Sequence, residues 1–162
     1  MPPAGVELGT MKIAIGADHA GFELKEKIRQ RLVQEGNEVH DKGTHSTDSV
    51  DYPDFARLVG EEVSRKEAEF GVLVCGSGIG MSIAANKVPG VRAAHVTNMY
   101  EAQMAREHNN ANVVTVGSRV LDEWTAIQAV ETFLHTAFAG GRHERRVQKI
   151  MDIEHQEQAH HA

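Results

Sequence analysis

Apolar residues follow two kinds of pattern along this chain. Short runs rich in Val, Ile and Ala have the length of strands buried on both faces of a sheet. They alternate with longer segments in which apolar residues recur every three or four positions, the spacing of one face of a helix. The short runs predict strands over residues 11–16, 37–41, 72–74, 91–96 and 112–117. The longer segments predict helices over 20–35, 53–63, 79–87, 98–108, 121–136 and 142–158.

Strands that alternate with helices in this way are joined by right-handed crossovers, which build a parallel sheet. The pattern therefore predicts an α/β protein with a three-layer, Rossmann-like fold. Its five-stranded parallel sheet carries helices on both faces, and an extra helix follows at the C-terminus. A single domain over 11–154 contains these elements, between a flexible tail at 1–10 and a C-terminal tail at 155–162. In such folds ligands bind beyond the carboxyl ends of the strands.

Composition argues against several classes of function. The 162 residues carry a net charge of −6, which argues against a nucleic-acid surface. No apolar run reaches the roughly 18 residues of a membrane span, and the first residues lack the pattern of a secretory signal. The single cysteine cannot form an internal disulfide, which fits a reducing cytoplasm. We therefore expect a cytoplasmic protein with neither a membrane nor a nucleic acid as its partner.

The third strand leads into the strongest candidate for chemistry. Cys75 ends its apolar run, and a glycine-rich turn then opens the next helix; the turn is Gly76, Ser77, Gly78, Ile79 and Gly80. Glycines let the backbone approach a ligand, and a helix N-terminus favours the thiolate of a cysteine placed there. The alternative is a tight connection beside a cysteine that serves as a small apolar residue. Two other motifs fit poorly, because the dinucleotide fingerprint needs G-x-G-x-x-G and a cysteine phosphatase needs Arg where Met81 stands.

Other candidates follow strands or helix ends. Asp18 and His19 follow the first strand and Arg119 follows the fifth, so we expect them at the same sheet edge as Cys75. Asp18 could instead cap the next helix. His108 ends a helix, where its charged form is favoured, and a histidine there can also act as a general acid.

A basic cluster opens the last helix. Arg142 and Arg146 are four residues apart, so they share one helix face and can grip one phosphate, whereas Arg145 points elsewhere. The alternative is a solvated basic face. Because the protein is acidic overall, concentration of positive charge at this position favours an anion-binding interpretation.

Taken together, these motifs resemble the type B ribose-5-phosphate isomerases. The resemblance runs from about Met11 to Glu154 in order and spacing. It rests on the segments GADHAG at 16–21, DYP at 51–53, CGSGIGMSIAANK at 75–87, HNNAN at 108–112 and GGRHERR at 140–146. Another branch of the family has glycine at the position of Cys75 and a glutamate base at that of Met81. This chain therefore resembles the cysteine branch, and Cys75 is the candidate base.

The resemblance implies a role for each motif. Cys75 would move a proton between C2 and C1 of the open-chain sugar phosphate, and the turn 76–80 would stabilise the enediolate. His108 would assist ring opening, with help from Asp18. The remaining residues would bind substrate: Asn109 the sugar, Arg142 and Arg146 the phosphate, and His19 and Arg119 further groups. The family also implies a homodimer, or a dimer of dimers, that shares each site between subunits, and neither a metal nor an organic cofactor.

The expected activity is the interconversion of D-ribose 5-phosphate and D-ribulose 5-phosphate through an enediolate, in the non-oxidative pentose phosphate pathway. Two alternatives stay open at this point. One is the same reaction on a six-carbon sugar phosphate, either allose 6-phosphate or galactose 6-phosphate. The relatives that act on galactose 6-phosphate pair unlike subunits, whereas this chain has a full set of site residues. The other is a non-catalytic sensor of a sugar phosphate, since a fold does not fix a function.

Overall fold

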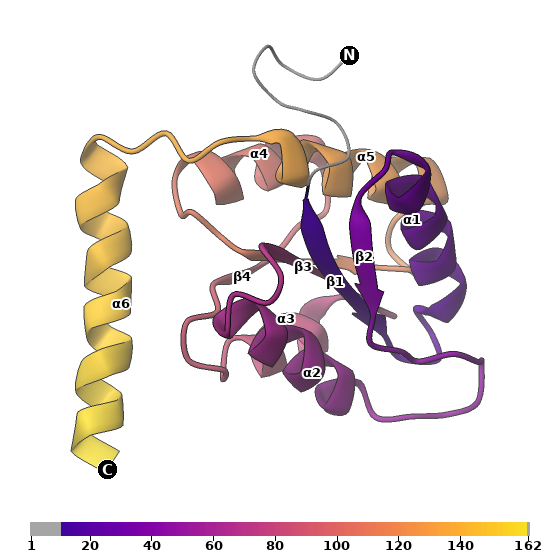
Figure 1. The fold of residues 1–162 in the computed structure, drawn as a ribbon, viewed down its shortest axis with the longest axis horizontal. Coiled ribbons are helices and arrows are strands. Elements are labelled where there is room, and N and C mark those ends of the chain that lie inside the picture. Colours follow the sequence, from indigo (N-terminus) through magenta and orange to yellow (C-terminus); the bar gives the residue numbers. More distant parts are fainter. Residues whose placement is uncertain (1–10, 162) are drawn as a thin grey trace.

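The computed structural model describes residues 11–161, so the tail expected at 1–10 lies outside the described residues. It has a five-stranded parallel sheet with helices on both faces, as the sequence predicts (Figure 1). Among residues 11–161, no helix combines the length and apolar content needed to cross a bilayer. In chain order the elements are β1 (Lys12–Ala17), α1 (Phe22–Gln34), β2 (Glu38–Asp41), α2 (Tyr52–Ser64), β3 (Phe70–Cys75), α3 (Ile79–Ala85), β4 (Ala93–His95), α4 (Met99–Glu107), β5 (Val113–Gly117), α5 (Glu123–His135) and α6 (Arg142–His161).

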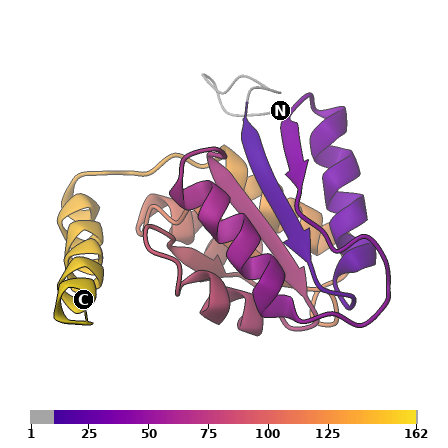
Figure 2. The same cartoon turned by 60° about the horizontal axis from the view of Figure 1, so that its bottom comes forward.

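The strand order β2-β1-β3-β5-β4 decides which helix covers which face. The chain moves one way along the sheet through α1 and α4, and the opposite way through α2 and α3. Right-handed crossovers in opposite directions place their helices on opposite faces. Accordingly α1, α4 and α5 pack over one face, and α2 and α3 pack over the other (Figures 1 and 2). The chain direction reverses between β1 and β3, which opens a crevice at their carboxyl ends.

Alternate residues of the central strands fill the two cores. Ile13 and Ile15 of β1 face the α1 side, where the rings of Phe70 and Phe133 meet edge to face with centroids 5.7 Å apart. Ala14 faces the other side, towards α2 and α3. The parallel register pairs Ala17 with Val74 and Cys75 with Gly117. The ends of β1, β3 and β5 therefore lie side by side.

The last helix, α6, stands away from this body in both views and is joined to it by an extended segment (Figures 1 and 2). It touches the body at a few points, among them the Glu154 carboxylate, which accepts the Gly90 N–H at 3.1 Å. Residues 155–161, which the sequence analysis places in a tail, are helical. Glu157 and His161 pair across one turn at 3.5 Å, and this stretch contains neither Gly nor Pro.

Candidate functional site

Cys75 is the last residue of β3, and its side chain is buried. Its Sγ accepts a hydrogen bond from the Gly78 N–H at 3.1 Å. Gly78 caps α3 with φ of 82°, a conformation that glycine adopts without strain. A Cβ there would lie 2.7 Å from the His95 ring. The glycine thus allows the backbone N–H to turn towards the thiol, which stabilises a negative charge on sulfur.

Strand β5 supports this turn from behind. The Thr115 hydroxyl is fully buried and donates to the Gly78 carbonyl at 2.9 Å, while His95 Nδ1 lies 3.3 Å from the same hydroxyl. A Cβ on Gly117 would lie 2.4 Å from the Ser77 carbonyl oxygen, so the turn lies directly on the strand. Neither Thr115 nor His95 was predicted from the sequence, because both look like ordinary strand residues. Their contacts with the turn depend on the pairing of distant strands.

Asp18, His19 and Arg119 lie at the same sheet edge as the Cys75 turn, as expected. The Asp18 N–H donates to the Val74 carbonyl at 3.3 Å, and its Oδ1 accepts the Gly21 N–H at 3.0 Å. Asp18 therefore closes the turn before α1, which leaves its other oxygen for a ligand. On the far side, the Arg119 N–H donates to the Gly76 carbonyl at 3.0 Å. We call Asp18, His19, residues 75–80 and Arg119 the cysteine half-site.

His108 and Asn109 lie elsewhere. They follow α4, which starts beyond the carboxyl end of β4 and runs back to the amino edge of the sheet, where β5 begins. Five residues of β5 span about 13 Å at 3.3 Å per step. The His108 ring stacks on that of His143 in α6, with centroids 4.2 Å apart and planes at 14°.

The start of α6 brings positive charge to this stack. Arg142 and Arg146 lie one turn apart on either side of His143. Partial desolvation lowers the pKa of the His143 imidazole, and the charges of His108, Arg142 and Arg146 lower it further. His143 was not among the predicted site residues, although its place inside the basic cluster was a signal. We call His108, Asn109, Arg142 and Arg146 the arginine half-site.

The two half-sites do not meet within one chain. Across the described part, residues 11–161, no hydrogen bond or ion pair joins a member of one to a member of the other. The structure therefore divides the predicted site into a thiol at the carboxyl edge and a group of cations near the amino edge.

The side chains best spaced for a metal lie outside both half-sites. Within residues 11–161, Glu35, Glu131 and His135 have donor atoms within 4.8 Å of one another. Arg31 supplies positive charge here, since its Nε lies 3.6 Å from the Glu131 carboxylate. Burial and the neighbouring Glu131 carboxyl raise the pKa of Glu35 to about 7. Protonation of Glu35 relieves the repulsion between the two neighbouring carboxyls.

Comparison with known proteins identifies the family. Residues 13–150 match the family model described as Ribose/Galactose Isomerase. The chain belongs to this family. Ribose-5-phosphate isomerase B of Escherichia coli (strain K12) is 47% identical over 143 residues, which cover 88% of this chain and 96% of that protein. The resemblance found from the motifs is thus confirmed over nearly the whole chain.

Solved structures of the family agree with the fold. Ribose-5-phosphate isomerase B of Clostridium thermocellum superposes with a TM-score of 0.89 at 52% identity and covers 90% of this chain and 99% of its own. The enzyme of Mycoplasma genitalium, solved with bound ribulose 5-phosphate, gives a TM-score of 0.86 at 43% identity and covers 88% of this chain and 95% of its own.

Proposed function

We propose that the protein interconverts D-ribose 5-phosphate and D-ribulose 5-phosphate. The observation that carries this proposal is the placement of Cys75. The only thiol of the chain ends a central strand at the edge where α/β folds bind ligands, with a backbone N–H directed at its sulfur. Relatives that match this chain over nearly their whole length are named ribose-5-phosphate isomerase B. We favour the pentose over the six-carbon alternative for that reason.

In the proposed reaction the Cys75 thiolate removes the proton from C2 of the open-chain aldose. The C2–H electron pair forms the C1–C2 double bond, and the C1 carbonyl oxygen takes up the negative charge of an enediolate. Backbone N–H groups of the turn 76–80 stabilise that charge. The C2 hydroxyl proton then passes to the C1 oxygen, and the thiol returns its proton to C1 as the C2 oxygen becomes the ketone carbonyl. A base that works as a free thiol needs a reducing compartment, so we place the protein in the cytoplasm.

We further propose that a second copy of the chain completes each site. His108 would open the furanose ring with the help of Asp18, Asn109 would bind the sugar, and Arg142 and Arg146 would bind the phosphate. In one chain His108, Asn109 and the two arginines lie at the wrong end of the sheet to reach a sugar at Cys75. The arrangement of α6 supports a partner copy, because Ile150 and Ile153 are exposed on it by 44% and 63%. Such a pair is a homodimer, which could assemble further into a dimer of dimers.

Turnover of ribose 5-phosphate beside allose 6-phosphate, by wild type and Cys75→Ala, tests the function. We expect wild type to prefer the pentose. Loss of a positioned base should reduce kcat of the variant by about a thousandfold or more. Its Kd for ribulose 5-phosphate should stay within about threefold. Turnover of the hexose alone would show that the substrate is a six-carbon sugar phosphate. Binding without turnover by wild type would indicate a sensor.

A further inference from the structure

One of the largest fully buried side chains within residues 11–161 carries a charge. Lys25, on α1, has no exposed surface. Its Nζ donates to both carboxylate oxygens of Asp41, at 2.8 and 2.9 Å, and to the Thr44 carbonyl at 2.7 Å. An ammonium group has three protons, so each of them has a partner. Nothing in the proposed reaction uses this lysine.

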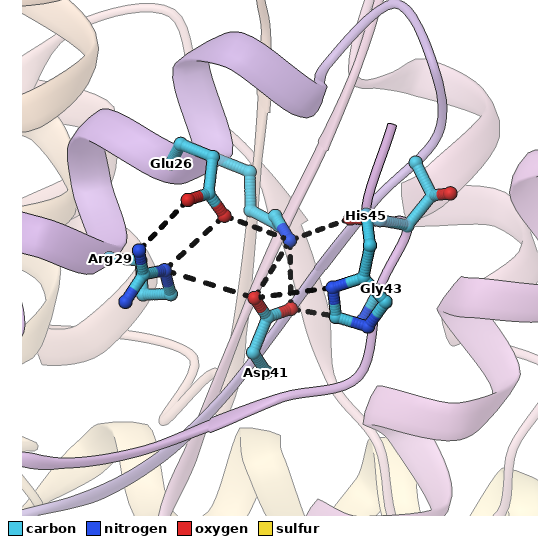
Figure 3. A network of polar contacts seen from close by, with 7 residues as sticks. Glu26, Arg29, Asp41, Gly43 and His45 are labelled. Carbon is cyan, nitrogen blue, oxygen red and sulfur yellow. Dashed lines mark hydrogen bonds and ion pairs between the residues drawn. The ribbon is translucent and has the colours of Figure 1, made fainter. Parts of the chain in front are cut away.

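Lys25 joins three separate segments of the chain. It comes from the first turns of α1, Asp41 ends β2, and Thr44 lies in the loop 42–51 that leads to α2. Figure 3 shows Asp41 at the centre of this network, with Glu26 and Arg29 on one side and Gly43 and His45 on the other. Asp41 Oδ1 also accepts the Gly43 N–H at 3.0 Å. The ion pair thereby sets the path of the loop where it leaves the sheet.

The same loop borders the cysteine half-site at both of its ends. Near its start, the Gly43 carbonyl accepts the Ala17 N–H and the Thr44 N–H donates to the Ala17 carbonyl, each at 2.8 Å. Near its end, the Val50 N–H donates to His19 Nδ1 at 3.2 Å. That bond fixes which ring nitrogen of His19 accepts, so the other nitrogen carries the proton and can donate to a substrate. Asp18 has separate anchors at Gly21 and Val74.

A buried ion pair is a poor means of adding stability. Removing two charges from water costs about as much as their attraction returns, and apolar side chains of the same volume often serve as well or better. What the pair supplies is a defined geometry, because the ammonium donates only to acceptors placed around it. Here those partners are the end of a short strand and a loop carbonyl. The geometry is therefore the property that an apolar replacement would lose.

We propose that Lys25 and Asp41 are positioning residues, which hold the loop 42–51 so that its Val50 N–H orients the His19 imidazole towards the sugar. This inference rests on the proposed function, since it assumes that His19 contacts a sugar phosphate in the cysteine half-site. The base is not involved. The Cys75 sulfur is oriented by Gly78 and supported by β5, neither of which touches the loop 42–51 through a hydrogen bond.

The test is the double variant Lys25→Met/Asp41→Asn, which removes both charges at nearly constant volume and keeps an acceptor for the Gly43 N–H. We expect KM for ribose 5-phosphate to rise about tenfold, the effect of one lost hydrogen bond to substrate, with kcat within about threefold of wild type. The rate of Cys75 alkylation by iodoacetamide, and its pH dependence, should match wild type. This separation of KM from both kcat and thiol reactivity would not follow from general loosening of the fold.

The chain offers a matched control in Lys12→Met/Glu38→Gln. This pair joins β1 to β2, the strand that ends at Asp41, at 3.9 Å, but both side chains are exposed and neither side chain has a hydrogen bond or ion pair with the loop 42–51. We expect its KM and kcat to equal those of wild type. Equal KM values in the two double variants would overturn the positioning role. So would a loss of kcat and thiol reactivity in parallel with KM.

The variant could fail to fold, and a milder change covers that case. Asp41→Asn alone keeps the shape of the network, and we expect a smaller rise in KM at unchanged kcat. Collapse of both variants, measured by circular dichroism beside the folded control, would show that the pair serves the fold and would overturn the proposal. Absence of turnover in wild type would instead overturn the proposed function, so the two failures are distinguishable.

Discussion

The two half-sites are built in opposite ways. The cysteine half-site lies where three central strands end, and backbone hydrogen bonds or buried side chains hold its members. The arginine half-site lies just after α4 and in the first turns of α6, a helix that stands apart from the body (Figure 1). Arg142 and Arg146 are exposed, and no hydrogen bond from either side chain is seen within residues 11–161.

The contrast assigns different tasks to the two regions. Proton transfer needs a base placed to within a fraction of an ångström, and a sheet edge supplies that rigidity. Phosphate recognition tolerates more freedom, because a dianion attracts cations over several ångströms. Under the proposed function, the fold of one chain would position the base, whereas capture of the phosphate would be left to a segment that a partner copy can position.

The largest effect should come from distorting the cysteine half-site. Gly78→Ala places a Cβ 2.7 Å from the His95 ring and 2.8 Å from the Val116 carbonyl carbon, at φ of 82°. The turn must shift, and a misplacement near 1 Å costs about a hundredfold in rate. We expect kcat to fall by about that factor. Gly36→Ala is the control, since Gly36 has a similar φ of 87° at the end of α1, away from both half-sites. An unchanged kcat in Gly78→Ala would show that this turn does not orient the base.

A smaller and different effect should come from the arginine half-site. Arg142→Met removes a charge-assisted hydrogen bond worth about 2 kcal/mol, which corresponds to roughly a thirtyfold rise in KM. We expect kcat to change little, because the base is untouched. Arg145→Met on the same helix is the control and should leave KM near wild type. Steady-state kinetics that show equal rises for the two variants would indicate general electrostatic attraction instead of a phosphate site.

The smallest effect should come from a cluster outside both half-sites. Burial and Glu131 raise the pKa of Glu35 to about 7 in the folded protein, against a usual value of 4.5. Between these values the unfolded chain releases a proton that the folded protein keeps, so the free energy of unfolding falls as pH rises from about 4.5 to about 7. Above that range Glu35→Gln should be more stable than wild type by about 1 kcal/mol, whereas near pH 4 the gain should vanish.

Urea unfolding of Glu35→Gln at pH 4 and pH 8 measures this difference, and activity at pH 8 should stay that of wild type. An equal stability change at both pH values would contradict the raised pKa. A loss of activity would show that the cluster is coupled to one of the half-sites.

Local patterns were sufficient to predict much of the fold and the cysteine half-site. Buried parallel strands have continuous apolar runs, and the glycines after Cys75 mark a turn in which Gly78 adopts the left-handed conformation that favours glycine. Residues that directly follow strands necessarily share an edge of a parallel sheet, which brings Asp18 and Arg119 to Cys75. Each of these inferences uses only neighbours in sequence and one rule of topology.

Long-range contacts could not be predicted in this way. A lysine in a helix such as Lys25 is expected to be exposed to solvent. Its partner Asp41 lies 16 residues away on another element. Thr115 looks like any residue of an apolar strand, and only its hydrogen bond to the Gly78 carbonyl distinguishes it. The separation of His108 from Cys75, however, could have been predicted from the order of the elements in the sequence. A helix between parallel strands runs back to the amino edge, so a histidine at its end lies far from the carboxyl edge.

The central claim is that two chains share each site, and a mixing experiment tests it most directly. Cys75→Ala lacks the base, and Arg142→Met/Arg146→Met lacks the phosphate-binding pair, so each alone should be nearly inactive at low substrate. In a dimer that contains one chain of each, one site has both defects and the other has none. Unfolding and refolding the two variants together at equal amounts makes half of the dimers hybrid, so activity should return to about one quarter of wild type. Hybrid dimers that form, as judged by a tag on one variant, but show no restored activity would contradict the account.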